Sequence, residues 1–290
     1  MFVSSNNTVY VANRASSRVF IWPEGSTTPV TNISNGLSTP YSVFVTDNGN
    51  IYIDNGASNS RVDQWQFNSN GSVPAMFTCD ICYDLFVDLN NYIYCSMTND
   101  HEVIAKSLNT ALNVWSTVAG TGTAGSTTTT LSSPRGIFID FNFNLYVADS
   151  GNARVQRFSY IQQIGTTVAG ATAPGTISLS TPTDVALDAD GYLFILDSEN
   201  QRIVGSGPYG FRCIAGCTQS AGAASYQMDS PSLFAFDTYG NIYVTDRDNN
   251  RVQKFLLSTN ICSKYHSYKA NTCKIIRLPS RWIGNFINFC

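Results

Sequence analysis

Residues 131–158 carry the pattern that decides the fold: Leu131-Ser-Ser-Pro134-Arg-Gly-Ile-Phe-Ile-Asp140, then Asn144-Leu-Tyr146-Val-Ala-Asp149, then Asn152-Ala-Arg154-Val155-Gln-Arg-Phe158. Residues 230–255 repeat it as Ser230-Pro231-Ser-Leu-Phe-Ala-Phe-Asp237, Gly240-Asn241-Ile-Tyr243-Val-Thr-Asp246 and Asn250-Arg251-Val252-Gln-Lys-Phe255. Each copy holds three short runs of β-branched and aromatic residues, separated by residues that favour turns. Runs of this kind predict three consecutive strands.

The pattern recurs along nearly the whole chain. Further copies follow Pro40 and Pro182, a degenerate copy surrounds Tyr94, and a partial copy begins at Phe2. The aromatic residue of the central run recurs at spacings of 42, 42, 52, 48 and 49 residues, at Tyr10, Tyr52, Tyr94, Tyr146, Phe194 and Tyr243. Runs such as Thr117-Val-Ala-Gly120 supply a fourth strand. The sequence therefore predicts an all-β, six-bladed β-propeller with four-stranded antiparallel blades over residues 1–262.

The repeat resembles that of the NHL family, on the pattern Pro-x-x-apolar-apolar-apolar-Asp, Gly-Asn-apolar-Tyr-Val-x-Asp and Asn-x-Arg-Val. The resemblance extends from about Met1 to Asn260 and rests on four good copies. It implies a propeller whose ligands bind at a face formed by loops, with no single chemistry attached.

Composition and charge restrict the partners. Only 13% of the residues are charged, against about 25% in an average domain, and there is no run of 18 apolar residues that would span a membrane. The chain has 17 basic and 20 acidic residues; five of the basic ones follow Ser263, which leaves 12 against 20 before it. An acidic propeller would repel phosphate, so nucleic acid is not an expected partner.

A pair of charged residues brackets the turn after the second strand. It is Asp149 with Arg154, and the other copies have Asp197 with Arg202 and Asp246 with Arg251. The first two repeats have Asn13 with Arg18 and Asn55 with Arg61, and the third has Met97 and Glu102. Residues that are lost together are expected to contact each other, because one left alone would be an unpaired buried charge. We interpret the pair as structural.

The two ends of the chain give two further expectations. Phe2-Val3-Ser4 aligns with Phe44-Val45-Thr46, so the first repeat begins inside its innermost strand, and we expect an upstream portion that could hold a signal peptide. Residues 263–290 are basic and predict a disordered or poorly packed tail. The alternative is a closing strand from Cys273-Lys-Ile-Ile-Arg-Leu278.

Eight cysteines favour disulfides and an oxidising compartment, hence an extracellular or cell-surface location. A zinc site from Cys79 and Cys82 would need a second ligand pair, so a disulfide is favoured there. Cys95 aligns with Val and Ile positions and is expected to be a buried thiol. The disulfide candidates are Cys79, Cys82, Cys213, Cys217, Cys262 and Cys273, with Cys213 and Cys217 forming a local bridge.

The residues that follow the repeat's Pro position are expected to surround the mouth of the central channel. They differ from one repeat to the next, as a specific binding site requires, and include the tyrosine and arginine side chains common at binding hot spots. The candidate ligand- or partner-binding residues are Tyr41, Ser42, Tyr83, Asp84, Arg135, Thr183, Asp184 and Ser232. Asp84 and Asp184 could coordinate calcium, or could only cap turns.

These residues favour a monomeric scaffold that binds a protein or a glycan and needs no cofactor. The alternative is a hydrolase or lyase that depends on a divalent cation held by Asp84 and Asp184. Peptide-amidating lyases have a similar repeat and hold zinc with histidines at the channel, but this chain has only His101 and His266. A three-histidine site is therefore excluded.

Overall fold

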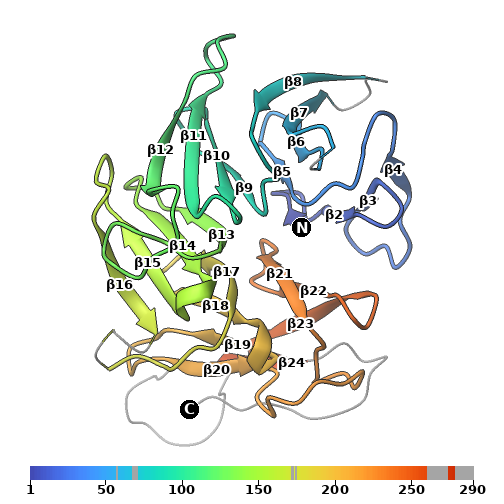
Figure 1. The fold of residues 1–290 in the computed structure, drawn as a ribbon. Coiled ribbons are helices and arrows are strands. Elements are labelled where there is room, and N and C mark those ends of the chain that lie inside the picture. Colours follow the sequence, from blue (N-terminus) through green and yellow to red (C-terminus); the bar gives the residue numbers. More distant parts are fainter. Residues whose placement is uncertain (57, 67–70, 171–172, 174, 260–273, 278–290) are drawn as a thin grey trace, which may run out of the picture.

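The computed structural model describes residues 1–56, 58–66, 71–170, 173, 175–259 and 274–277. Within them, six four-stranded antiparallel sheets surround a central channel as the blades of a propeller, which confirms the predicted fold (Figure 1). Each blade is built from consecutive strands, innermost first. Blades 1 to 3 are β1 (Phe2–Val3), β2 (Val9–Asn13), β3 (Arg18–Trp22), β4 (Thr31–Ile33); β5 (Val43–Val45), β6 (Asn50–Asp54), β7 (Arg61–Gln66), β8 (Ser72–Phe77); β9 (Leu85–Val87), β10 (Tyr92–Met97), β11 (Glu102–Ser107), β12 (Trp115–Gly120).

Blades 4 to 6 follow the same order and include two short 3-10 helices between their second and third strands. Among the described residues, no helix is long and apolar enough to cross a membrane. The elements are β13 (Pro134–Ile139), β14 (Leu145–Asp149), η1 (Ser150–Asn152), β15 (Arg154–Phe158), β16 (Gly165–Gly170); β17 (Pro182–Leu187), β18 (Leu193–Asp197), η2 (Ser198–Asn200), β19 (Arg202–Gly205), β20 (Arg212–Ala215); β21 (Pro231–Phe236), β22 (Ile242–Asp246), β23 (Arg251–Thr259), β24 (Lys274–Arg277).

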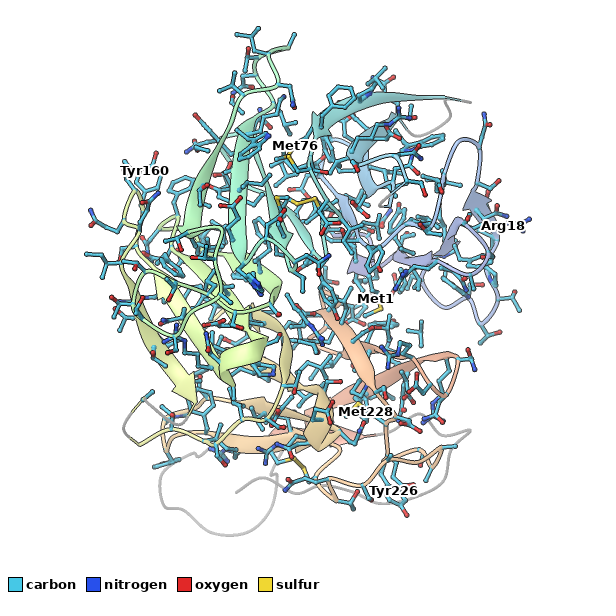
Figure 2. All side chains as sticks on the ribbon, viewed as in Figure 1. Met1, Arg18, Met76, Tyr160, Tyr226 and Met228 are labelled. Carbon is cyan, nitrogen blue, oxygen red and sulfur yellow. A yellow bond between two sulfur atoms is a disulfide. The ribbon has the colours of Figure 1, made fainter. Side chains whose placement is uncertain are left out.

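The hydrophobic core lies between neighbouring blades. Six clusters of buried side chains fill the six interfaces, and the last of them joins Val3 and Val9 of blade 1 to Leu233 of blade 6. Figure 2 shows this filling, with Met1 near the centre and Arg18 and Tyr160 at the rim. Asn7 Oδ1 also accepts hydrogen bonds from the N–H and Oγ1 of Thr238, both at 2.9 Å. No blade can bury its faces alone, so the fold depends on the closed ring.

The charged pair of the repeat is structural, as predicted. Asp149 and Arg154 lie opposite each other in the β14–β15 ladder, with Arg154 Nε 2.7 Å from Asp149 Oδ2 and both side chains buried. The guanidinium also donates to the carbonyl groups of Ser126, Thr127 and Thr130 in the loop that enters the blade. The pair therefore ties that loop to the second and third strands. Asp197–Arg202 and Asp246–Arg251 repeat it at 3.0 and 2.6 Å.

In blade 2, Asn55 takes the place of the acid, as predicted: its Oδ1 accepts the N–H of Ser38 as Asp149 Oδ1 accepts that of Ser132. Arg61 still has a carboxylate partner, because Asp63 of the same strand lies 2.9 Å from its Nε. Asn55 donates to Asp63 Oδ2 at 2.6 Å and binds the entering loop through Gly36 and Ser38. Asn55 and Arg61 keep the opposed positions of the repeat, because the N–H of Asn55 donates to the carbonyl of Arg61 at 2.9 Å, although the turn between them is one residue longer than in blade 4.

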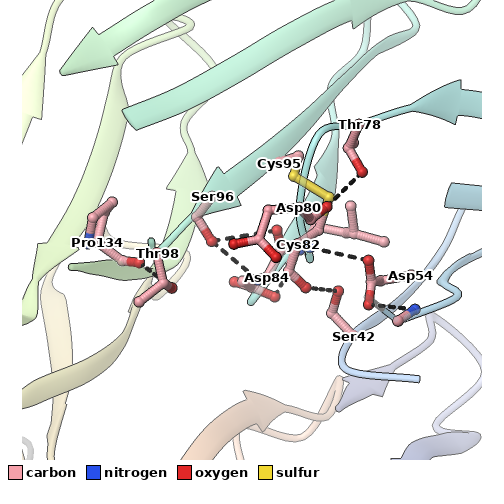
Figure 3. Close-up of a disulfide and its surroundings, with 12 residues drawn as sticks. Ser42, Asp54, Thr78, Asp80, Cys82, Asp84, Cys95, Ser96, Thr98 and Pro134 are labelled. Carbon is pink, nitrogen blue, oxygen red and sulfur yellow. Dashed lines mark hydrogen bonds between the residues drawn. A yellow bond between two sulfur atoms is a disulfide. The ribbon is translucent and has the colours of Figure 1, made fainter. Parts of the chain in front are cut away.

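The disulfides confirm one prediction and correct another. Cys213 and Cys217 form the expected local bridge. Cys82 bonds to Cys95, which was predicted to be a free buried thiol (Figure 3). Cys79 is exposed and has no disulfide partner among the described residues, so the predicted Cys79–Cys82 pair is wrong. Cys82 takes the buried position that proline holds in other blades, and from there it faces Cys95 across the core of blade 3. Cys262 and Cys273 lie outside the described residues.

The segment after residue 259 bears on the predicted tail. β24 pairs with β23, with Leu256 opposite Arg277 and Thr259 opposite Lys274, and supplies the fourth strand of blade 6. This corresponds to the closing strand that we named as the alternative. The predicted boundary between residues 262 and 263 lies outside the described residues and stays a prediction.

Candidate functional site

The predicted mouth residues lie where the innermost strands leave regular pairing. In blade 4, Pro134 pairs with Asp149 and Ile137 with Val147, so Arg135 lies in a bulge between the two pairs. Blades 5 and 6 have the same shift at the start of β17 and β21. A bulge turns side chains away from the ladder. These bulges and the turns between second and third strands form one end of the channel, which we call the polar end.

Two tyrosine–arginine pairs occupy the polar end. The guanidinium carbon of Arg14, in the turn after β2, lies 3.6 Å from the ring centroid of Tyr41. That of Arg135 lies 5.4 Å from the ring of Tyr83, within the range of a cation–π interaction. Arg135 Nε is buried and has no hydrogen-bond partner among the described residues. Buried donors are normally paired, so this N–H is an unsatisfied donor among the described residues.

Arg247 is the second arginine that the sequence analysis missed, after Arg14. It follows Asp246 in the turn after β22, is two-thirds exposed, and lies 2.9 Å from Asp248. Its charge acts on the hydroxyl of Tyr83. Burial, with smaller effects of Asp184 and Asp84, raises the pKa of Tyr83 to about 12, against the lowering effects of Arg135 and Arg247. Both arginines stand one residue after the acidic position of the repeat, which is the signal that could have found them.

Two of the predicted residues make side-chain hydrogen bonds within the protein, and a third is buried without one. Ser42 is fully buried and donates from Oγ to the carbonyl of Cys82 at 3.0 Å. Thr183 is buried as well, and its Oγ1 has no partner within the described part of the chain. Ser232 Oγ lies 2.8 Å from Thr245 Oγ1. Ser42 and Thr183 are thus buried, whereas Ser232 is partly exposed.

Asp84 and Asp184 each connect two neighbouring blades. Asp84 accepts the backbone N–H of Leu85 at 2.9 Å and that of Ile137, in the next blade, at 3.0 Å. Asp184 accepts the N–H groups of Val185 and Phe234 in the same manner, at 2.9 and 2.7 Å. These bonds satisfy N–H groups that the bulged strand starts leave open. The two aspartates therefore join neighbouring blades, and calcium binding by them stays a prediction.

The space for Asp184 depends on a glycine in the neighbouring blade. A Cβ atom at Gly136 would lie 2.4 Å from Asp184 Oδ1 and 2.5 Å from its Cα. Any larger residue would therefore push the two blades apart. Gly136 follows Arg135 in the bulge, so the same local geometry positions the arginine and admits the carboxyl group.

The two carboxyl groups titrate above the ordinary range of aspartate. Burial in the narrow channel raises the pKa of Asp84 to about 6, against the lowering effect of the N–H groups it accepts. Burial, and then the charge of Asp84, raise the pKa of Asp184 well above its ordinary value. In the described residues, no three His, Cys, Asp or Glu side chains come together in a group that could hold a metal ion.

A pocket that the sequence analysis did not predict lies at the opposite end of the channel. It has a volume of about 810 Å³, and its lining includes Phe2, Phe44, Phe86 and Phe138 from the innermost strands of blades 1 to 4. Successive ring centroids are 4.7, 5.1 and 5.4 Å apart. We call this the apolar end. Its signal is visible in the repeat, because all four phenylalanines pair with the tyrosine anchor of their blade, where blades 5 and 6 have Ala186 and Ala235.

The aspartates of the apolar end close turns. Asp88 Oδ1 accepts the N–H groups of Asn90 and Tyr92, at 2.9 and 2.8 Å. Asp140 and Asp188 do the same in blades 4 and 5. This local bonding explains the aspartate that ends the first run of the repeat.

Comparison with known proteins supports the repeat and the fold. The NHL repeat family matches residues 229–255, and no curated protein matches the sequence. A structural genomics protein of unknown function from Bacteroides thetaiotaomicron has a TM-score of 0.69 at 15% identity, over 88% of this chain and 67% of that one. A chain of a nidogen/laminin complex has a TM-score of 0.65 at 14% identity, over 85% and 88%.

A third similar structure is a catalytically inactive virginiamycin B lyase from Staphylococcus aureus, crystallised with quinupristin. Its TM-score is 0.60 at 12% identity, over 87% of this chain and 78% of that one. At these identities the likeness concerns the fold alone. The chain is thus a six-bladed β-propeller with an NHL repeat at residues 229–255, which is consistent with an NHL-repeat β-propeller.

Proposed function

We propose that this propeller binds a protein partner at the polar end of its channel, and that it does so outside the cell or at its surface. The observation that carries the proposal is the pair formed by Tyr83 and Arg135, whose buried Nε has no hydrogen-bond partner among the described residues. Leaving such a donor unpaired costs about 1–3 kcal/mol, which a ligand that accepts the hydrogen bond would recover.

The charges at the polar end favour an acidic group on the partner. Arg14, Arg135 and Arg247 lie toward its opening, whereas the oxygens of Asp84 and Asp184 accept backbone N–H groups. A carboxylate entering this opening would meet guanidinium donors first. Charge-assisted hydrogen bonds to arginine are among the stronger ones that proteins form.

The geometry favours a protein over a glycan. Glycan binding through tyrosines would need an open aromatic face, but the guanidinium of Arg14 covers one face of Tyr41 at 3.6 Å. Rigid tyrosine and arginine side chains held in pairs resemble the hot spots of protein interfaces.

The disulfides support the location. Cys82–Cys95 and Cys213–Cys217 are both formed in the structure, and bonds of this kind persist in oxidising compartments. The similar propeller in the nidogen/laminin complex is consistent with a fold used in protein assemblies.

The experiment is affinity capture from extracellular fluid with the immobilised propeller, quantified by mass spectrometry. We expect one or more proteins to be retained by the wild type and lost with the double variant Tyr83→Ala, Arg135→Ala. Tyr209→Ala is the matched control, because Tyr209 is 81% exposed in the turn between β19 and β20, at the opposite end of the molecule. Melting temperatures verify that all variants are folded.

The outcomes separate the alternatives. If the double variant retains every protein that the wild type retains, the polar end is not the binding site. If deglycosylation of the fluid abolishes capture, the ligand is a glycan and the proposal of a protein partner is wrong.

A further inference from the structure

The pocket at the apolar end is large enough for a separate ligand. Its volume of about 810 Å³ falls within the range of about 300–1,000 Å³ that small-molecule sites occupy. The phenylalanines of blades 1 to 4 form its inner wall, and Leu187 extends the apolar surface into blade 5. The exposed side chains of Leu89 and Phe141 continue this surface at the opening.

The polar groups of the lining have one sign of charge. Asp47, Asp88, Asp140 and Asp188 come from the turns after the innermost strands of blades 2 to 5. None of the described residues that line the pocket is a lysine, arginine or histidine. An anion placed here would meet four carboxylates and no compensating cation.

The four carboxylates are held in different ways. Asp88, Asp140 and Asp188 are fixed by the backbone N–H groups of their own turns. Asp47 is exposed and makes no hydrogen bond to the rest of the described chain. It can therefore rotate toward a ligand without breaking a contact, whereas the other three contribute a fixed negative field.

We propose that the apolar end binds a small organic cation with an apolar body, such as a hydrophobic amine. The body would lie on the phenylalanine rings, and the ammonium group would lie among the acidic turns. A cation within about 6 Å of an aromatic face is attracted by it, by about 0.5–2 kcal/mol depending on desolvation. Aromatic wall, acidic opening and volume together fit this class better than an anion or a sugar.

The test uses three probes of similar shape and different charge. They are the cationic amine 2-(2-naphthyl)ethylamine, the neutral alcohol 2-(2-naphthyl)ethanol and the anionic carboxylate (2-naphthyl)acetate. Isothermal titration calorimetry with the full chain at pH 7 measures each dissociation constant. We expect the amine to bind about ten times more tightly than the alcohol, and the carboxylate to bind most weakly. The preference for the amine should shrink as salt is raised, because salt screens exposed charges.

Two variants and a control test whether the probes bind in the pocket at the apolar end. Asp47→Asn should raise the dissociation constant of the amine by about threefold and leave that of the alcohol unchanged. Phe86→Ala should weaken both probes, because Phe86 contacts the rings on either side of it. Asp248→Asn removes an exposed carboxylate at the polar end and should change neither probe.

The proposal is overturned if no probe binds at millimolar concentration, or if the alcohol binds as tightly as the amine. Binding of the amine that survives Asp47→Asn and Phe86→Ala in folded protein overturns it as well. Because Asp47 is exposed and makes no hydrogen bond within the described chain, its variant tests the site even if Phe86→Ala fails to fold.

Discussion

At the polar end of the channel, tyrosine–arginine pairs stand above buried carboxyl groups, whereas at the apolar end four phenylalanines stack beneath acidic turns. Both ends come from the same strands. They differ because the first residues of an innermost strand bulge out of its ladder and the last residues stay in register. Residues in the bulges differ from blade to blade, while residues in register repeat as a row. One repeat thus yields two chemically distinct surfaces.

The largest effect should come from the charged pair that braces the polar end. Asp149→Ala removes the partner of Arg154 and leaves a buried guanidinium without a carboxylate. Removing one partner of a buried pair costs about 3–5 kcal/mol, so denaturant unfolding should show a loss of that order. Asp248→Ala, which breaks an exposed pair, should leave the unfolding midpoint nearly unchanged. Similar losses in both variants would contradict the structural role of the buried pair.

A pH-dependent effect should follow at the polar end. Burial raises the pKa of Asp54 to about 7, and its carboxyl group accepts the N–H groups of Cys82 and Gly56. Between pH 4 and 7 the folded chain holds a proton there that the unfolded chain has lost, so its contribution to stability falls as pH rises.

The Asp54→Asn variant lacks this titration. Any change that the substitution itself causes in the free energy of unfolding does not depend on pH. The difference in free energy of unfolding, variant minus wild type, should rise by up to about 1.4 kcal/mol per pH unit between pH 4 and 7. Urea unfolding at pH 4.5, 5.5 and 6.5 measures the slope, and Asp190→Asn, at an exposed position, is the control. A flat difference between variant and wild type would show that Asp54 is ionised in the folded state.

A smaller loss of stability is expected at the apolar end. Phe86 lies between Phe44 and Phe138 but is only partly buried. Complete burial would make Phe→Ala cost about 3–5 kcal/mol, so we expect about 2 kcal/mol from Phe86→Ala in denaturant unfolding. A loss equal to that of Asp149→Ala would mean that the row of phenylalanines braces the ring as strongly as the charged pair does.

The smallest effect should come from metal removal. The oxygens of Asp84 and Asp184 accept backbone N–H groups and are poorly placed to bind calcium. We therefore predict that chelation, and calcium or zinc added back, leave the melting temperature unchanged. A bound ion at a hundredfold excess over its dissociation constant would contribute about 2.7 kcal/mol, which a melting curve would reveal. A shift restored by one ion would favour the hydrolase or lyase alternative.

The sequence predicted the architecture because its information is local and repeated. Turn residues, apolar runs and the Asp149–Arg154 pattern recur, so the number of blades and the structural role of the pair followed from alignment. Alignment of the repeats did not predict contacts that occur in one blade only. The Cys82–Cys95 bond joins a proline position to a valine position, and neither position in other blades indicates that the two side chains meet.

The candidate site was predicted only in part for a similar reason. The alignment located Tyr83 and Arg135 at one end, and the structure brings their side chains together. It could not show that Ser42 and Thr183 turn inward, because the direction of a side chain in a bulge depends on the neighbouring blade. Phenylalanine recurs at one position of the repeat in four blades, which the sequence shows. That these side chains line a pocket depends on how the four blades converge, which the sequence does not show.

Hydrogen exchange of the propeller with and without its captured partner tests the central claim most directly, because it reports which end is covered. We predict slower exchange in the turns at residues 14–17 and 247–250, and no change in the turns at 46–49 and 140–143. Protection confined to the second pair of turns would place the partner at the apolar end and contradict the proposed function.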